Sequence, residues 1–176
     1  VVLPATVRAA RLDLKITAKK VGYYMGAGDE VPASLRQMGC TVEILKDEDL
    51  EPAKLKTFDA VVMGVRAYNT KDALAFKQDA LLEYVNNGGT LIVQYNTNFE
   101  LTVDATKLGP YPIKLGRSRV TDELSEVRFL DSNHPVLNTP NKLSAADFNG
   151  WVQERGLYFP SEWDAQYAAP LSMNDP

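Results

Sequence analysis

The sequence of 176 residues has a single cysteine, Cys40, and a single histidine, His134. One cysteine cannot form an internal disulfide. One cysteine and one histidine cannot supply a His-rich or Cys-rich zinc site. We therefore expect no metal and no cofactor. A nucleophilic pair of Cys40 and His134 is also disfavoured, because Cys40 begins a predicted strand and lies away from the carboxyl ends where ligands bind.

Long apolar runs and an excess of positive charge are lacking as well. Lys and Arg total 19 against 23 Asp and Glu, a net charge of -4, so nucleic acid is not an expected partner. No apolar stretch approaches the ~20 residues that span a bilayer, and the first residues do not read as a signal peptide. Because the chain begins at Val1, we expect a piece of a longer protein. The compartment is open, with an extracytoplasmic location as the working expectation.

The composition, 45% apolar and 24% charged, is that of one ordinary globular domain. Strands and helices alternate along its first half, which predicts a parallel sheet with helices on both faces. The expected fold is therefore a three-layer, flavodoxin-like α/β domain. The predicted strands are 20–25, 41–45, 58–64 and 90–95, and the predicted helical segments are 33–38, 47–52 and 73–87.

The two ends of the chain are less regular. Residues 11–17 alternate as a half-buried strand would, or form the tail of a preceding domain, so 1–19 is predicted as a tail or linker and 20–176 as the domain. No closing helix precedes residue 176, which suggests truncation there. In between we expect a loop at 108–120, a strand at 126–130, a turn at 133–142, a helix at 143–151 and a bent strand at 156–164.

Polar side chains follow the first, third and fourth predicted strands. In a doubly wound sheet, ligands bind beyond the carboxyl ends of the strands, where the strand order reverses. Gly26 and Gly28 suggest a dinucleotide turn, but the third glycine is replaced by Val31, so a tight turn is the favoured interpretation. The residues predicted to line a ligand site are Asp29, Glu30, Arg66, Tyr68, Asn69, Gln94, Asn96 and Asn98.

Each of these groups has an alternative role. Arg66 offers a planar fork for a carboxylate or a hydroxyl-rich ligand, or it forms an ion pair with Asp29 or Glu30. The amides after the fourth strand can bind sugar hydroxyls, or they can satisfy the backbone of their own loop. His134 can act as an acid or base, with Glu30 as its candidate partner, or it is a turn histidine bonded to backbone.

Five phrases of the sequence are specific when taken together. They are "KVGYYMGAGDEVPASLRQMG", "FDAVVMGVRAYNT", "LLEYVNNGGTLIVQYNTNF", "HPVLNTPNK" and "GWVQERGLYFPSEWD". With these phrases the chain resembles the C-terminal region of large bacterial PIG-L (LmbE-like) deacetylases over most of residues 20–176. That region in turn looks like the ThuA-like branch of the class I glutamine amidotransferase superfamily.

The resemblance implies a function for the chain. Where an amidotransferase has its cysteine, this chain has "QYNTN", which implies a degenerate active site. The implied role is a non-catalytic accessory domain, carbohydrate-facing or domain-organising, beside an upstream zinc-dependent deacetylase domain of the same chain. Two alternatives are a ThuA-like sugar-processing enzyme that uses His134 with Asp29 or Glu30, and a structural domain that forms a homodimer.

Overall fold

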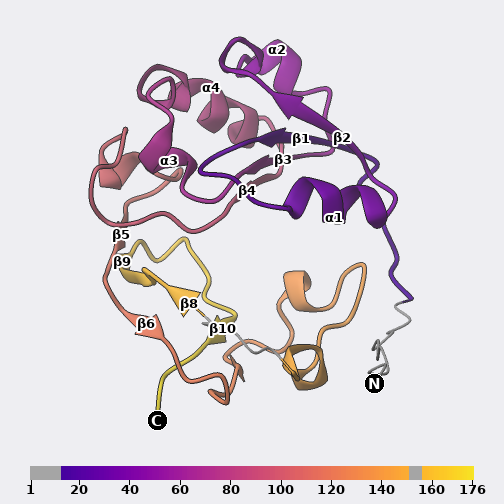
Figure 1. Ribbon diagram of the computed structural model, residues 1–176, viewed down its shortest axis with the longest axis vertical. Coiled ribbons are helices and arrows are strands. Elements are labelled where there is room, and N and C mark those ends of the chain that lie inside the picture. Colours follow the sequence, from indigo (N-terminus) through magenta and orange to yellow (C-terminus); the bar gives the residue numbers. More distant parts are fainter. Residues whose placement is uncertain (1–12, 151–155) are drawn as a thin grey trace, which may run out of the picture.

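A four-stranded parallel sheet is the centre of the computed structural model, which describes residues 13–150 and 156–176 (Figure 1). Its strand order is β2-β1-β3-β4, so the chain crosses over between β2 and β3. This is the order of a flavodoxin-like sheet, and the predicted α/β class with parallel strands is confirmed. The strands are β1 (Lys20–Tyr24), β2 (Thr41–Leu45), β3 (Ala60–Met63) and β4 (Leu91–Val93).

Helices pack on both faces of this sheet. Helix α1 (Val31–Gln37) lies on one face, and α2 (Pro52–Leu55) and α4 (Leu74–Asn86) lie on the other (Figure 1). Successive side chains of a strand point to opposite faces. Tyr23 accordingly belongs to the core cluster beside α1, whereas Tyr24 belongs to the larger cluster beside α4.

The face beside α1 is covered only in its middle. Ile44 of β2 pairs with Tyr23 and Ile92 of β4 pairs with Val62, so both isoleucines point to the α1 face. They remain 44% and 49% exposed. Helix α1 has only seven residues, and although Val42 of β2 packs against the cluster beside it, Ile44 and Ile92 are not covered. The complete three-layer arrangement therefore stays a prediction.

Two segments differ from the expectation. The predicted loop 65–72 contains a short helix, α3 (Ala67–Thr70), because one helical turn is too short to show an apolar period in the sequence. The predicted strand at 11–17 is not formed in its described part, residues 13–17. The backbone of Lys15 is instead bound by the side chain of Asn141, at 2.8 Å to its N–H and 3.0 Å to its carbonyl.

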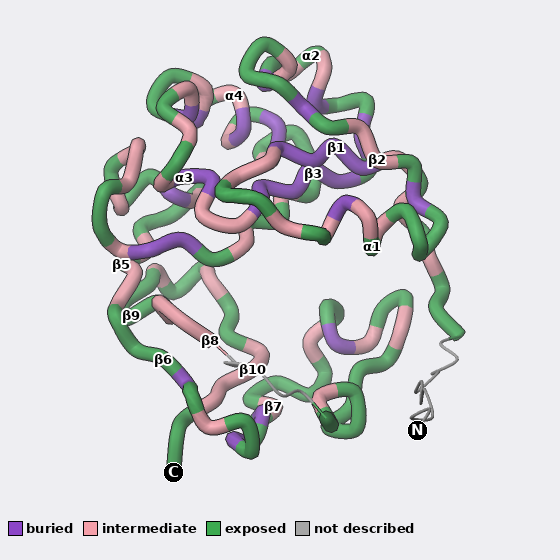
Figure 2. The backbone as a smooth tube through the Cα atoms, viewed as in Figure 1, coloured by how far each residue is buried: buried purple, intermediate pink, exposed green. Residues whose placement is uncertain are grey.

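The second half of the chain forms short antiparallel pairs that lie below the sheet in Figure 1. The expected loop 108–120 contains two of these strands, whose partners lie more than 35 positions away and leave no local signal. Figure 2 shows that buried residues are concentrated around the parallel sheet and are sparse here. The pairs are β5 (Ile113–Leu115) with β9 (Pro160–Trp163), β6 (Arg119–Val120) with β8 (Gly156–Leu157), and β7 (Arg128–Phe129) with β10 (Leu171–Ser172).

Short 3-10 turns complete the chain. The helix expected at 143–151 is the 3-10 turn η4 (Ala145–Phe148), and residue 151 lies outside the described residues. The other turns are η1 (Asp47–Asp49), η2 (Ala105–Lys107) and η3 (Pro135–Leu137). Within the described ranges, no helix is long and apolar enough to cross a bilayer.

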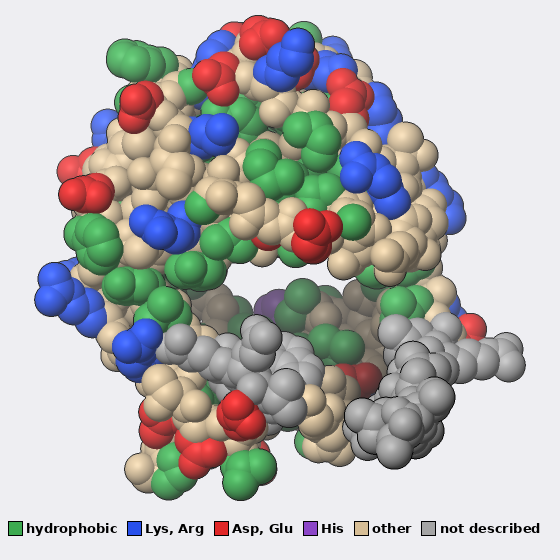
Figure 3. Space-filling model, viewed as in Figure 1, with side chains coloured by type: hydrophobic (Ala, Val, Ile, Leu, Met, Phe, Trp, Pro, Cys, Tyr) green, Lys and Arg blue, Asp and Glu red, His purple; other side chains and the backbone are tan. Residues whose placement is uncertain are grey.

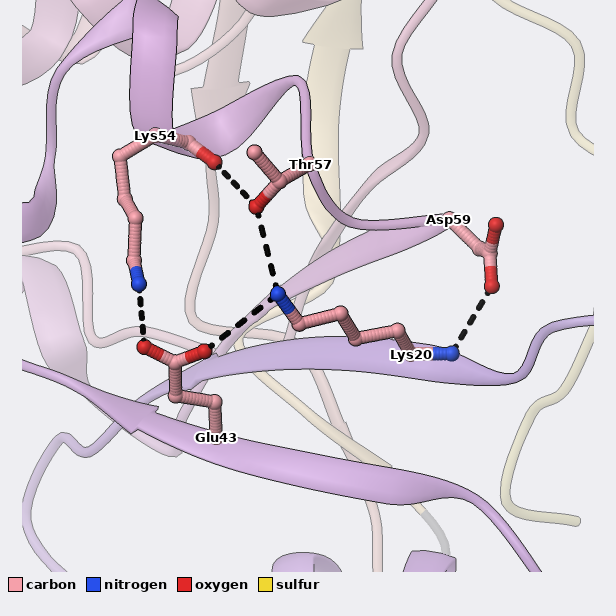
Figure 4. Close-up of polar contacts among 5 residues, drawn as sticks. All are labelled: Lys20, Glu43, Lys54, Thr57 and Asp59. Carbon is pink, nitrogen blue, oxygen red and sulfur yellow. Dashed lines mark hydrogen bonds and ion pairs between the residues drawn. The ribbon is translucent and has the colours of Figure 1, made fainter.

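Paired charges hold the amino end of the sheet (Figure 4). The Asp59 carboxylate accepts the backbone N–H groups of Lys19 and Lys20 at 2.7 and 2.8 Å, and these hydrogen bonds lower its pKa. Glu43 is bonded to the ammonium of Lys54, with that of Lys20 at 3.6 Å. These charges are engaged with one another, whereas the loops of the candidate ligand site lie at the opposite, carboxyl end.

Candidate functional site

Asp29 joins the carboxyl ends of three strands. Its Oδ1 accepts the Tyr23 hydroxyl at 2.5 Å and the Val31 N–H at 3.0 Å, and its Oδ2 accepts the Val65 N–H at 3.2 Å. The Gln94 amide then donates to the Tyr23 oxygen at 2.7 Å. A hydrogen-bond chain therefore runs from β4 through β1 to the loop after β3.

The Tyr23 hydroxyl was not among the predicted site residues. Burial raises its pKa well above the ordinary value, and the bond to the Asp29 carboxylate raises it further. It therefore stays protonated at neutral pH and acts as a donor. The adjacent pair Tyr23 and Tyr24 could have indicated it. Neighbouring strand residues face opposite sides of a sheet, and each buried hydroxyl needs a hydrogen-bond partner. The Tyr24 hydroxyl donates to Asp47 Oδ1 at 2.6 Å.

The loops after β1 and β3 touch directly. The Ala27 N–H donates to the Val65 carbonyl at 2.7 Å, and a Cβ atom on Gly26 would lie 2.1 Å from that same oxygen. A side chain at this position would push the loops apart. Gly26 is thus explained by close backbone approach, as expected for a tight turn. Glu30 stands at the N-cap of α1 with an exposed side chain, for which the described residues show no hydrogen bond or ion pair.

Arg66 has an unfavourable backbone and an unsatisfied side chain. Its φ and ψ are 56° and 29°, the left-handed region, which costs a non-glycine residue about 1–2 kcal/mol. Its N–H donates to the Tyr95 carbonyl at 2.9 Å, which joins the loops after β3 and β4. Its Nε is buried without a hydrogen-bond partner among the described residues, which also show no ion pair to Asp29 or Glu30.

Two of the predicted amides bind backbone groups and join the loops after β3 and β4. Asn96 accepts the Tyr68 N–H at 3.0 Å and donates to the Gln94 carbonyl at 2.9 Å. Asn69 accepts the Thr97 N–H at 2.9 Å and donates to the carbonyl of residue 99 at the same distance. Both amides satisfy loop backbone, which for Asn96 is the alternative given above.

The other two polar side chains of this corner differ from each other. The Tyr68 side chain is buried in the core and donates to Gln78 of α4 at 2.8 Å, and burial raises its pKa to about 12. Its ring therefore points away from the corner. Asn98 is half-buried, and its Oδ1 is enclosed without a hydrogen-bond partner among the described residues.

His134 is a turn histidine in this structure. Its Nδ1 accepts the Val136 N–H at 3.3 Å at the start of η3, and its carbonyl accepts the Asn138 amide. No hydrogen bond or ion pair among the described residues joins it to Asp29 or Glu30. Cys40 is buried, with its thiol directed at the Ala18 carbonyl. Across residues 13–150 and 156–176, no three His, Cys, Asp or Glu side chains are grouped to hold a metal ion.

A cavity of about 1030 Å³ begins at the same corner. Gln94 and Asn96 line it, but Asp29, Arg66 and Asn69 do not. The expected ligand residues therefore share one end of the sheet without sharing this cavity, which extends instead along β4 toward β5 and β9. Figure 3 shows an open hollow between the part that holds the sheet and the segments below it.

No family model matches the sequence, and neither does any curated protein. Among solved structures, the chain is similar to a protein from Bacteroides uniformis ATCC 8492 described as ThuA-like. The sequence identity is 19% and the TM-score is 0.39, and the match covers 72% of this chain and 58% of that chain. So distant a likeness assigns no function to this chain.

Proposed function

We propose that this chain is a non-catalytic accessory module that binds a hydroxyl-rich ligand, a carbohydrate, at the carboxyl end of its sheet. The observation that carries the proposal is Arg66, a strained residue with a buried and unpartnered donor. Strained backbone and unsatisfied buried groups cluster at functional sites, where the strain serves binding.

The ligand class follows from the two unsatisfied atoms. Arg66 Nε is a donor and Asn98 Oδ1 is an acceptor, and both belong to loops at the carboxyl end of the sheet. A hydroxyl group both accepts and donates, so a ligand with several hydroxyls offers a partner for each kind of atom. A carboxylate or phosphate offers acceptors only, which suit the arginine donor but not the Asn98 acceptor. This pairing favours a neutral sugar.

The same corner supports binding rather than catalysis. The Asp29 carboxylate accepts three hydrogen bonds from the protein and the Tyr23 hydroxyl donates one of them, so both groups are already engaged within this corner. Residues 94–98 contain no thiol and no histidine. The sequence resemblance to PIG-L deacetylases and to ThuA-like amidotransferase domains supports a role beside a deacetylase that acts on N-acetylglucosamine. An enzyme using His134 with Asp29 or Glu30, and a structural dimerisation domain, are the alternatives.

Calorimetric titration with N-acetylglucosamine and its short oligomers tests this function. We expect Arg66→Ala to weaken binding by about 1–3 kcal/mol, the value of a charged hydrogen bond, while the fold is kept. Arg36→Ala is the matched control, because Arg36 lies in the last turn of α1 and its side chain donates to the Val42 carbonyl at the other edge of the sheet. It should bind as the parent does.

Other results would contradict the proposal. Unchanged binding in a folded Arg66→Ala variant would refute the site. Turnover of the sugar by the purified chain would favour the enzyme instead. A stable dimer that binds none of these sugars would favour the structural domain.

A further inference from the structure

The outer edge of β4 carries unpaired backbone groups. Val61 N–H donates to the Thr90 carbonyl and Gln94 N–H donates to the Met63 carbonyl, so residues 90 and 94 face β3. In a parallel pair, alternate residues direct both N–H and C=O to the same side. Leu91 and Val93 therefore point these groups away from β3, and β4 has no second partner strand among the described residues.

A groove without charge lies along this edge. It is the cavity of about 1030 Å³ described above, and it lies between β4 with α4 on one side and β5 with β9 on the other. None of the side chains that line it carries a charge. Most are apolar, among them Leu82, Val85, Ile113, Leu157 and Phe159. Its volume is at the upper end of the range for small-ligand sites.

The opposite edge of the sheet, strand β2, has charged side chains beside it. On β2, Arg36 caps the Val42 carbonyl at 3.2 Å, and Glu43 binds Lys20 and Lys54. Proteins protect edge strands from further pairing with charges of this kind. Residues 88–99, which contain β4, include no charged residue at all. The β2 edge is protected and the β4 edge is not.

We propose that the β4 edge binds an extended, uncharged strand from a separate polypeptide, which adds to the sheet beside β4. The backbone of the strand pairs with Leu91 and Val93, and its alternate apolar side chains fill the groove. Charge decides the chemistry of this partner, because a lining without charges offers no counter-ion and burying an unpaired charge is expensive.

A second copy of this chain fits the edge less well. In the second copy too, β4 with α4 faces β5 with β9 across the groove, so the edge of β4 is enclosed on its open side. It is therefore not presented as a free strand that can enter a neighbouring groove. A partner with a free extended segment meets no such obstacle.

A blocked peptide of alternating valine and threonine, about seven residues long, is the probe. We measure its affinity by fluorescence anisotropy and the hydrogen exchange of the Leu91 and Val93 amides by NMR. We expect saturable binding with slowed exchange at both amides. A peptide of the same sequence with alternate backbone nitrogens methylated keeps the side chains and loses the donors, so it should bind about tenfold or more weakly.

Two variants of one strand residue and a matched control complete the test. Val93→Pro removes an outward N–H without touching the bonds to β3, and Val93→Lys places a charge at the groove. Both should weaken the peptide about tenfold or more, so the test survives if the proline variant fails to fold. Ile92→Lys changes the opposite face of the same strand and should leave the affinity unchanged.

The remaining outcomes overturn the proposal. Equal affinity for the methylated peptide would make the groove a site for apolar side chains without strand pairing. Exchange at Leu91 and Val93 that slows with protein concentration, in the absence of peptide, would make a second copy the occupant. If the peptide does not bind the parent protein, the proposal that the β4 edge binds an uncharged strand is wrong.

Discussion

Replacement of Arg66 by asparagine should make the protein more stable. Asparagine tolerates the left-handed backbone, so the change recovers much of the about 1–2 kcal/mol that this conformation costs arginine. It also removes the buried, unpartnered Nε, whose lost hydration costs about 1–3 kcal/mol. Against these gains stands the loss of the half-buried methylene stem, worth about 1 kcal/mol. We expect a net gain of about 1 kcal/mol or more.

The magnitude can be measured by urea and by thermal unfolding. For a chain of this length a gain of about 1 kcal/mol corresponds to a rise in Tm of about 2–4 °C. Glu100→Asn is the matched control. Glu100 has a φ of 54° and an exposed side chain, so its replacement changes the free energy of unfolding only through relief of backbone strain. The difference between the two variants isolates the arginine side chain. A loss of 1 kcal/mol or more in Arg66→Asn would show that Arg66 is structural and would refute the argument from strain.

Two further predictions concern hydrogen bonds elsewhere in the chain. Tyr23→Phe leaves Asp29 and Gln94 without a shared partner and should destabilise the fold by about 1–3 kcal/mol in urea unfolding, whereas an unchanged midpoint would deny the network any role in stability. Asp175 accepts the N–H groups of Thr121 and Asp122, and these bonds lower its pKa. A carboxyl whose pKa is lowered in the folded state stabilises the fold at pH values above its unfolded pKa of about 3.9. This stabilisation is lost as the pH falls through the folded pKa. Asp175→Asn should therefore be less stable than the parent at pH 7, with the gap narrowing below about pH 4, and a constant gap would contradict the assignment.

The sequence predicted the first half of the fold because that half is built from local patterns. Strand β2 lies within the residues expected, and α4 agrees to within one residue at each end, since a half-buried strand and a long helix each show their own period. The second half escaped because β5 and β6 pair with residues more than 35 positions away. Strands of two or three residues show no alternation that could be recognised.

The candidate site was predicted in part for a similar reason. The carboxyl-end loops of β1, β3 and β4 meet, as parallel strand order requires, through Asp29 to Val65 and Arg66 to Tyr95. The partner of each side chain could not be predicted, because the sequence does not distinguish an amide that binds turn backbone from an amide that faces a ligand. The left-handed φ of Arg66 likewise has no signature, since arginine rarely adopts it.

The contact between Asn141 and Lys15 determines how a pull on the chain would be transmitted. Asn141 binds both the N–H and the carbonyl of Lys15, across 126 positions of sequence and only five residues before β1 begins. A force applied at residue 13 would load these two hydrogen bonds, and with them the turn at 133–142, before it loaded the parallel sheet. The segment below the sheet therefore lies in the mechanical path between the start of the described chain and the core.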